Sequence, residues 1–490
     1  MFLDARITDI EDSWLVDKGY ECWTSYAEEF IPGGYQCYVS KASQLAYLIQ
    51  NINDFGLNRL EIYLEADIDL KGVLNEDSSA GDSSTGDMAA GDSSSGGVGS
   101  YGILTSPKLL WSPINAANID ILIYGNEFTI RNLTSREGGL FSNVNSIEVH
   151  DLNMENVSIY TDSASGYNSS PMGAIVSDCS SFCYFYNVVL KSGAIRAVNN
   201  YVGGFVGSCN GDGHFEYCFN GIDVTGCSSF TNYAWSQVVG GFVGCSGYSC
   251  YLRYCTNVGK ISALVCYAEI STLAVGGFVG YTNSTSGSYD NCYNFGDVEI
   301  NLLAHPEVLL CGGIVGSTSG NMFDYCAFQA DIKIFNLISE WLPPDICWLG
   351  GIVGGGHLPS LGDASVDDFD GSIESSYSVY EIYCWNCVTY EEMVPTPYIR
   401  NGICSVYNYY ELVVRTNSIT NEAIGSDGPL FSGGGRKVTT SELDEGVFAF
   451  SRNINGGLPF LREMFAIGEF IDCECNPADY LADQYGFERI

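Results

Sequence analysis

Five nearly identical segments recur at an almost constant interval, and this recurrence constrains the fold more than any other feature of the chain. Each reads Gly-Gly-Φ-Val-Gly, where Φ is Phe or Ile, and they span Gly203–Gly207, Gly240–Gly244, Gly276–Gly280, Gly312–Gly316 and Gly350–Gly354. Their starting positions, 203, 240, 276, 312 and 350, give intervals of 37, 36, 36 and 38 residues. A fixed period of this kind indicates a repeat architecture, in which each unit buries its apolar face against the next one.

Two further strand-like pieces follow each of the first four segments. The first piece has a cysteine at an equivalent position, and these cysteines are Cys218, Cys255, Cys292 and Cys326. The second piece is a Gly-Asp-Val-like stretch, such as Gly296–Val298. Strands this short are stable only when they are stacked. We therefore predict an all-β fold, a right-handed parallel β-helix (solenoid) with three strands per turn and about 4.8 Å between turns.

A β-propeller is the alternative architecture, because its blades also repeat after about 40 residues. A blade needs four antiparallel strands joined by hairpin turns. The chain shows three clear strands per period and no regular Asn-Gly hairpin at a fixed offset, which favours the solenoid.

The repeated glycines and cysteines lead to specific expectations. The glycines should supply conformational freedom and a slim profile at a corner, with the Φ side chain pointing inward and its neighbours outward. The four repeated cysteines should form a ladder of buried thiols, because stacked Cβ atoms about 4.8 Å apart exceed the roughly 3.8 Å of a disulfide. Local disulfides are more plausible, and the candidate pairs are Cys179 with Cys183, Cys245 with Cys250, and Cys22 with Cys37.

The chain divides into four predicted parts. Residues 1–73 form an N-terminal segment with a capping helix from Ser40 to Asp54 and the first strands. Residues 74–101 are a flexible insert rich in Gly, Ser and Asp, residues 102–400 are the solenoid, and residues 401–490 are a closing segment with a second cap. That second cap is a helix from Thr439 to about Asn453 with a capping box, so small helices cover both ends of the column.

The repeat, with its Cys-containing strand and Gly-Asp-Val piece, resembles the GLUG-motif repeat of bacterial surface proteins. The likeness covers roughly residues 36 to 465 and includes Gly125–Leu133, which is similar to the family's first full coil. It implies an adhesin-like protein outside the cell or on its surface. Such repeats also accompany secreted IgA-cleaving metallopeptidases, but the metal-binding HExxH motif is absent from this sequence.

Composition limits the partners. The formal charge of −39 repels nucleic acid and anionic membranes, so we predict neither as a partner. The chain has no apolar run of about 18 residues, so we predict no membrane span. The N-terminus lacks the order of a secretory signal. Either the protein is not secreted by that route or, as we expect, this is a mature chain whose signal has been removed. No cofactor is predicted beyond a weak surface calcium site in residues 75–100.

An enzyme is not predicted. A polysaccharide lyase or glycosidase on a β-helix is the minor alternative, with carboxylates from the set Asp363, Asp367, Asp368 and Asp370. The Cys384–Cys387 pair has redox spacing but no βαβ context, and a zinc site would need a second pair of ligands.

Binding is the favoured function. The variable loops before the Gly-Gly segments contain aromatic residues that could stack on a glycan or anchor a protein from a host or a neighbouring cell. The candidates are Phe230, Tyr233, Trp235, Tyr267, Trp341 and Trp348. Each of these side chains could instead simply pack against the column wall. A third possibility is a structural subunit that self-associates into an extracellular fibre or stalk.

Overall fold

The computed structural model describes most of the repeat region and a few shorter segments. The described ranges are 30–31, 34–51, 58–71, 111–161 without 112, 171–198, 201–228, 236–266, 271–337 without 285, 305 and 325, 346–356, 372–374, 377–385, 398–400, 413–417, 422–424, 448–449 and 460–461.

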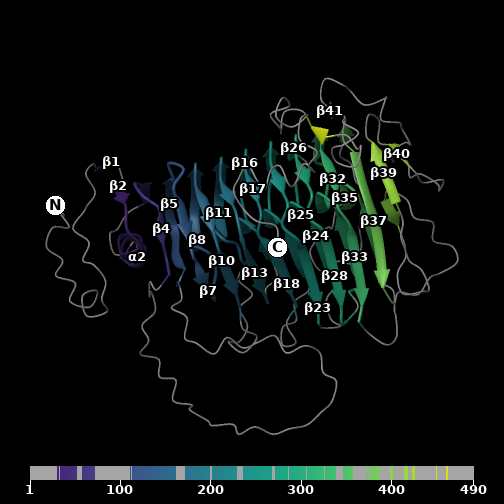
Figure 1. Cartoon of the computed structure of the whole chain (residues 1–490), viewed down its shortest axis with the longest axis horizontal. Coiled ribbons are helices and arrows are strands. Elements are labelled where there is room, and N and C mark those ends of the chain that lie inside the picture. The colour runs from purple at the N-terminus through teal and green to yellow at the C-terminus, as the bar shows by residue number, and fades with distance from the viewer. Residues whose placement is uncertain are drawn as a thin grey trace, which may run out of the picture.

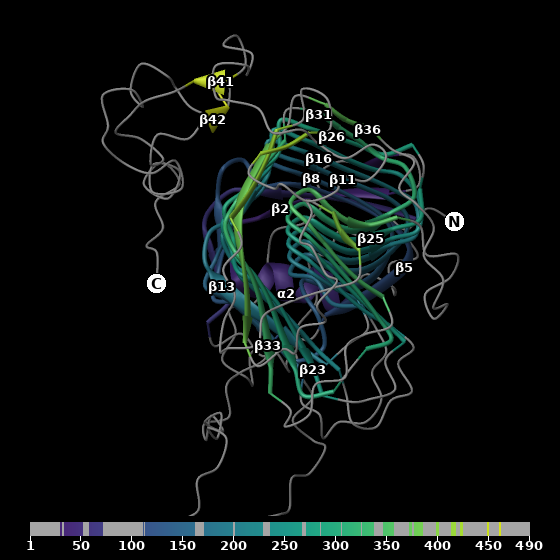
Figure 2. The same cartoon turned by 90° about the vertical axis from the view of Figure 1, so that its right-hand side faces the viewer.

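These residues form a parallel β-helix, as predicted. Strands from successive coils lie side by side along one axis, with residues from the start of the chain at one end and later ones at the other (Figure 1). Three large sheets result, which we call sheet A (16 strands), sheet B (18 strands) and sheet C (6 strands). Figure 2 looks along the column and shows the coils superimposed. Because the next coil completes the backbone hydrogen bonds of each strand, strands of two to five residues persist.

A coil contains five strands instead of the predicted three. One coil comprises β19 (Ser236–Gly240) in sheet C, β20 (Val243–Ser246) and β21 (Cys250–Arg253) in sheet A, and β22 (Thr256–Asn257) and β23 (Ile261–Val265) in sheet B. The two additional strands are β19 and β21. They lie in stretches whose sequences vary between coils, so the repeat alone did not reveal them.

The first coils cross sheet A differently. Here β5 (Ile114–Tyr124), β8 (Phe141–His150) and β11 (Val176–Tyr186) each run across the sheet as one long strand. The next coil covers the same width with two strands, β15 (Val206–Cys209) and β16 (Asp212–Glu216), both of which pair with β11. The column therefore changes its construction at β11.

Identical apolar side chains stack inside the column. The Φ residues Phe205, Phe242 and Phe278 are fully buried, and their ring centroids lie 4.7 and 4.9 Å apart. Phe185 and Phe215 stack in the same way at 4.9 Å. Aromatic pairs of this geometry stabilise by about 0.5–1.5 kcal/mol beyond the apolar area they bury, so each ladder favours the in-register arrangement.

A buried amide ladder lies next to the glycines. Asn220 donates to the Oδ1 atom of Asn257, and Asn257 donates to that of Asn294, both at 2.7 Å. Asn294 then donates to the backbone oxygen of Gly313 at 2.6 Å. All three side chains are completely buried, so every amide needs these partners.

The repeated glycines are required for space and not for φ. Among the described glycines, only Gly138 and Gly193 have positive φ, so the predicted conformational freedom at the repeat glycines is wrong. A Cβ on Gly241 would lie 2.1 Å from the oxygen of Gly277 and 3.1 Å from Oδ1 of Asn257. A Cβ on Gly280 would lie 2.5 Å from Cγ1 of Val238 in sheet C.

This close approach also buries residues that were expected to point outward. Sheet C packs against the first half of sheet A, so Val243 is as buried as its neighbour Phe242. A second, smaller apolar cluster lies there and includes Val238, Ala274 and Leu310. The Gly-Gly-Φ-Val-Gly segment therefore has both of its faces covered.

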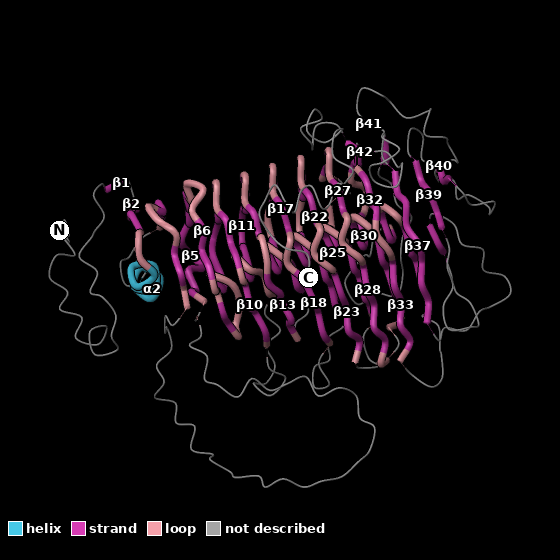
Figure 3. Tube along the Cα trace, in the orientation of Figure 1, coloured by secondary structure: helices cyan, strands magenta, loops and turns pink. Residues whose placement is uncertain are grey.

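The two ends are covered differently. At the start, α2 (Ala42–Asn51) lies at the end of the column (Figure 3), and its Leu45 and Leu48 side chains are buried. The Gln44 side chain accepts hydrogen bonds from the backbone N–H groups of Ser40 and Lys41. The strand β1 (Phe30–Ile31) pairs antiparallel with β2 (Gly34–Val39). This helix is the predicted N-terminal cap.

At the other end the described cover consists of antiparallel strands. These pairs are β34 (Ile346–Gly350) with β38 (Tyr398–Arg400), and β37 (Tyr377–Trp385) with β39 (Val413–Asn417). Most of the predicted helix at 439–453 lies outside the described residues. The Phe448–Ala449 stretch within it forms strand β41, so a helix cannot continue through it to Asn453.

The close approach of backbone at Gly241 predicts a sharp difference between two Gly→Ala substitutions. In Gly241→Ala the new Cβ clashes with backbone atoms, which can shift only at a high energetic cost. We therefore expect the unfolding free energy to fall by about 1–3 kcal/mol. In Gly247→Ala the nearest atom would be 3.5 Å away, and the change should stay within about 0.5 kcal/mol. Denaturant unfolding followed by circular dichroism measures both. Equal effects would contradict the close-packing argument.

The amide ladder makes a second prediction. Asn257→Ala removes the middle member and leaves buried amide groups without partners, so it should cost about 1–3 kcal/mol. Asn210→Ala is the matched control, because Asn210 is exposed and its amide bonds only Asp178, at 3.0 Å. We expect that control to melt within about 2 °C of the wild type. A similar shift for both variants would show that the buried ladder has no special role.

Candidate functional site

The outer surface of sheet A carries a band of aromatic side chains, which we call the aromatic face. These residues alternate with buried ones along their strands, so they point away from the core. Two further tyrosines lie at the adjoining corner between sheets A and B. The members of the aromatic face are Tyr38, Tyr63, Tyr124, His150, Phe182, Tyr184, Tyr186, His214, Tyr217, Tyr251 and Tyr254.

The band begins as a regular stack. Tyr38 in β2, Tyr63 in β3 (Arg59–Leu64), Tyr124 and His150 share one register position. Their ring centroids are separated by 5.2, 4.7 and 5.2 Å, with nearly parallel planes. Rings stacked along the column cover one another's faces. In this part of the band it is mainly ring edges and hydroxyl groups that face outward.

Polar groups in this first part are already used within the chain. Glu61 accepts hydrogen bonds from Gln36, Arg59 and Tyr63 at 2.7–3.1 Å. Burial alone would raise the pKa of Glu61, but these donors outweigh it and leave the pKa below its usual value. His150 lies 2.7 Å from a carboxylate oxygen of Glu148. The stack from β2 to β8 is therefore explained by its own internal contacts.

The band becomes irregular at β11. At the register position of His150, the next coil has Tyr186 and the coil after it has Glu216. From β11 onward, the aromatic residues lie two residues earlier in each strand, where Tyr184, His214 and Tyr251 are in register. His214 is tilted by 49° to Phe182 and by 51° to Tyr184, so these rings do not cover one another. Phe182 is 37% exposed and Tyr186 is 36% exposed.

The most informative residues are at the corner that follows these strands. Successive coils place Asp151, Asn187, Tyr217, Tyr254 and Asn291 there, with φ between 49° and 54°. Asn and Asp tolerate this left-handed conformation, whereas a bulky side chain adopts it at a cost of roughly 1–2 kcal/mol. Two consecutive coils therefore place tyrosine where the neighbouring coils have a residue that fits without strain.

The corner tyrosines form a partly exposed platform. The Tyr217 and Tyr254 rings stack at 4.9 Å with an angle of 11° between their planes, and Tyr186 meets Tyr217 edge-on at 5.7 Å. Tyr217 is 46% exposed. The guanidinium of Arg253 lies 5.0 Å from the Tyr254 ring centroid and 3.5 Å from a carboxylate oxygen of Asp290. Tyr and Arg side chains of this kind are typical of residues that dominate binding energy.

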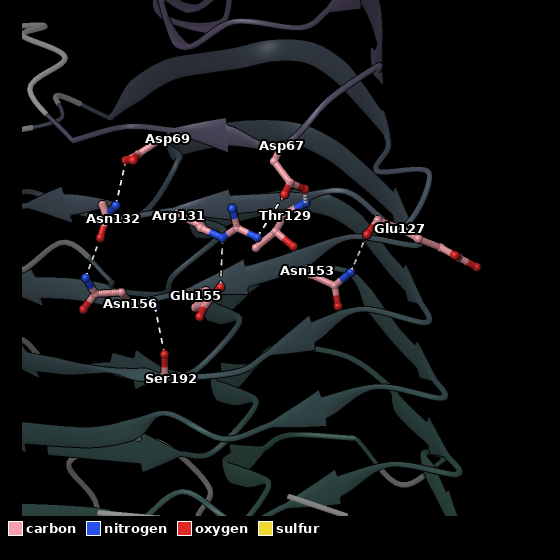
Figure 4. Close-up of polar contacts among 10 residues, drawn as sticks. All are labelled: Asp67, Asp69, Glu127, Thr129, Arg131, Asn132, Asn153, Glu155, Asn156 and Ser192. Atoms are coloured by element: carbon pink, nitrogen blue, oxygen red, sulfur yellow. Dashed lines mark hydrogen bonds and ion pairs between the residues drawn. The ribbon is translucent and has the colours of Figure 1, made fainter. Parts of the chain in front are cut away.

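The outer surface of sheet B has a different character. Arg131 bridges Asp67 and Glu155 at 2.9 Å each, and Asn132 joins Asp69 to Asn156 (Figure 4). The sticks in Figure 4 show these side chains bonded to one another across successive coils. Exposed ion pairs of this type contribute only about 0–1 kcal/mol each. This polar ladder is accounted for as a contact between coils.

The residues predicted to bind a ligand are not among the described side chains. Five of them, Phe230, Tyr233, Trp235, Tyr267 and Trp341, lie outside the described residues. The backbone of Trp348 belongs to β34, where it pairs with Leu310 of β29 (Val308–Gly312). The stretches that contain the first five connect sheet B to sheet C. The carboxylates of 363–370, the 75–100 insert and the 386–397 stretch also lie outside the described ranges.

The structure places the cysteine ladder inside the column. Cys218, Cys255, Cys292 and Cys326 are buried free thiols at equivalent positions in successive coils. Three of them lie 3.4 Å from a backbone oxygen of the preceding coil, which for Cys255 is the oxygen of Phe215. Burial raises the pKa of Cys218 well above its usual value. These thiols act as small apolar side chains.

The predicted local disulfides are not formed. Cys179, Cys183, Cys245 and Cys250 are all free thiols, and so is Cys37, while Cys22 lies outside the described residues. Cys245 and Cys250 lie in separate strands, and burial raises the pKa of Cys245 to about 12. Cys183 instead approaches Cys209 of the next coil, a contact between residues distant in sequence that spacing alone could not reveal.

Sequence reasoning missed the aromatic face. The available signal was the residue before each ladder cysteine, which is Tyr217, Tyr254, Asn291 and Tyr325 in successive repeats. An alternation of Tyr and Asn at one position is informative once the position is known to require positive φ. Without that knowledge, these tyrosines cannot be distinguished from ordinary strand residues.

Other kinds of site find no support in the described part of the chain. No group of three or more His, Cys, Asp and Glu side chains there could hold a metal ion. Among the same residues, no helix has the length and apolar character needed to cross a membrane.

Backbone strain at the corner predicts that replacing a strained tyrosine is harmless to the fold. Tyr254→Asn removes stacking energy but also relieves strain of similar size, so unfolding free energy should change by less than about 1 kcal/mol. Tyr251→Asn is the matched control in the adjacent strand, where φ is not positive and the ring stacks on His214 at 4.6 Å. That change should cost about 1–2 kcal/mol. The reverse order of stabilities would contradict the assignment of strain.

Comparisons with known proteins add little to this description. No protein-family model matches the chain, and no curated protein matches it. Among solved structures, it is similar to a chain described as a putative immunoglobulin A1 protease from Bacteroides ovatus. The sequences are 13% identical, the TM-score is 0.40, and the match covers 69% of this chain and 84% of the other.

Proposed function

We propose that this protein is an extracellular or cell-surface β-solenoid that binds a glycan or a protein through the corner of its aromatic face. The binding surface consists of Tyr186, Tyr217, Tyr254 and Arg253, with Phe182 and His214 beside them. The proposal includes membership of the adhesin-like GLUG-motif group that the repeat resembles. In this role the column is a rigid support and the corner is the recognition surface.

One observation carries this proposal. Two consecutive coils have tyrosine in a left-handed conformation where the coils on either side have asparagine. Stability alone favours Asn or Asp at such a position. Strained residues that persist in a structure are concentrated at binding and catalytic sites. A ligand contact explains why tyrosine is present there.

The chemistry of the corner suits a neutral or cationic ligand. Because the Tyr217 and Tyr254 rings stack on each other, they offer ring edges and hydroxyl groups, which can contact apolar groups of a sugar or a protein and also form hydrogen bonds. Glu216 and Asp290 flank Arg253 in register. With a chain charge of −39, nucleic acid and anionic membranes remain poor candidates. Neutral polysaccharides and basic protein surfaces are better ones.

The alternatives gain less support. A fibre built by end-to-end stacking needs open strand edges, and antiparallel strands cover part of each described end of the column. A polysaccharide-acting enzyme would depend on carboxylates such as those between 363 and 370, which lie outside the described residues. We therefore retain binding as the proposed function, without catalysis and without a cofactor.

Binding can be tested with the full-length chain on an array of neutral and acidic glycans and on a panel of extracellular matrix proteins. The double variant Tyr217→Asn/Tyr254→Asn should keep its fold and lose at least about tenfold in affinity for any ligand that the wild type binds, which corresponds to 1.4 kcal/mol or more. Surface plasmon resonance on the strongest ligand gives the ratio.

The matched control is Tyr160→Asn. Tyr160 is an outward-facing tyrosine of β10 (Val157–Tyr160) in sheet B, with the guanidinium of Arg136 located 5.5 Å from its ring. This variant should bind as the wild type does. Unchanged binding by the double variant would place recognition elsewhere, for example in the loops that contain Trp235 and Trp341. A wild type that binds nothing on either panel would count against the proposal as a whole.

A further inference from the structure

Three buried thiols meet where the column changes its construction. Cys179 and Cys183 belong to β11, and Cys209 ends β15 in the next coil. All three are completely buried. The sulfur atoms of Cys183 and Cys209 are 3.1 Å apart, which is closer than the roughly 3.5–4.0 Å of ordinary nonbonded contact. The three residues are brought together by the fold, since 26 residues separate Cys183 from Cys209.

The geometry of the strands distinguishes the possible pairs. Cys179 and Cys209 are direct register partners, so their Cβ atoms run parallel at about 4.8 Å, farther apart than the roughly 3.8 Å that a disulfide prefers. Cys183 has Gly213 as its register partner. Glycine has no side chain, and a Cβ there would lie 3.4 Å from the Cys183 sulfur. The missing side chain leaves room for Cys183 to turn toward Cys209.

We propose that Cys183 and Cys209 form a disulfide when the protein folds in an oxidising compartment, and that this bond links the β11 coil to the β15 coil. It lies next to the register shift between Cys179 and Phe182, where the long strands of the first coils give way to pairs of short strands. A covalent link at this step holds the two halves of the column in register.

The chemistry requires an external oxidant, and a thiol–disulfide oxidoreductase supplies it. A thiolate of the chain attacks the oxidoreductase disulfide and forms a mixed disulfide, and a second thiol of the chain then displaces the oxidoreductase. In total, two S–H bonds break and one S–S bond forms in the chain. The two electrons and two protons reduce the oxidoreductase disulfide to two thiols.

The attacking thiolate is that of Cys183 or Cys209, because the sulfur that takes up the mixed disulfide is one of the two in the final bond. Once one of these two sulfurs carries the mixed disulfide, the other displaces the oxidoreductase and the Cys183–Cys209 bond forms. The sulfurs are buried in the finished column, so the reaction belongs to the stage before the two coils close.

The test is a disulfide map of the full-length chain, produced in an oxidising compartment and purified without reductant. Free thiols are blocked with iodoacetamide in denaturant, and the protein is digested and analysed by mass spectrometry without reduction. We expect one linked peptide pair containing Cys183 and Cys209, with Cys179 alkylated. Alkylation of all three thiols, or a link that involves Cys179, would overturn the proposal.

Variants test the effect on stability. Reduction should lower the melting temperature of the wild type by roughly 5 °C, and it should have no such effect on Cys209→Ala. The control is Cys292→Ala, which removes a thiol from the separate ladder and should retain both the linked peptide and the shift on reduction. If Cys209→Ala does not fold, the peptide map of the wild type still decides. An equal shift in Cys209→Ala and the wild type would contradict the assignment.

Discussion

The structure depends on the in-register pairing of each coil with the next. Backbone hydrogen bonds between parallel strands fix the spacing, and this spacing places identical side chains directly above one another. Stacked phenylalanines and the amide ladder of Asn220, Asn257 and Asn294 then stabilise that same register. Glycine makes the arrangement possible, because any side chain at Gly241 or Gly280 would meet its neighbours at 2.5 Å or less. The repeat therefore specifies where the backbones of neighbouring segments can approach closely, as well as where the strands lie.

The proposed binding surface is a consequence of the same register. Pairing brings Tyr217 and Tyr254, which are distant in sequence, to a ring separation of 4.9 Å. The corner that holds them is set by the strands on either side, so the tyrosines are presented on a rigid support. A preformed aromatic surface loses little entropy when it binds a ligand. This is the advantage of placing recognition on a stacked column.

Much of the fold could be predicted from the sequence, since the Gly-Gly-Φ-Val-Gly period specifies a parallel stack and the equivalent cysteines specify a ladder. The five-strand coil could not, because β19 and β21 lie in stretches that do not repeat. The role of the glycines was only half predicted: their small size mattered, whereas their φ did not. Exposed positions are under no packing constraint, so the aromatic residues occupy a different register position from Tyr186 to His214. The sequence therefore shows no regular period of exposed aromatic residues. The Cys183–Cys209 contact likewise depends on a register shift within β11.

The central claim is that successive repeats lie one coil apart in register. It can be measured by electron paramagnetic resonance with pairs of spin labels at Asp223, Lys260, Asp297 and Asp331. These residues occupy consecutive register positions on sheet B. Their register follows from the pairing of β18 (Asp223–Cys227), β23, β28 (Val298–Leu302) and β33 (Ile332–Asn336). The separations from Asp223 should increase in equal steps of about 4.8 Å per coil, reaching about 14 Å at Asp331. Separations that exceed about 20 Å for adjacent repeats, or that do not increase with repeat number, would contradict the stacked column.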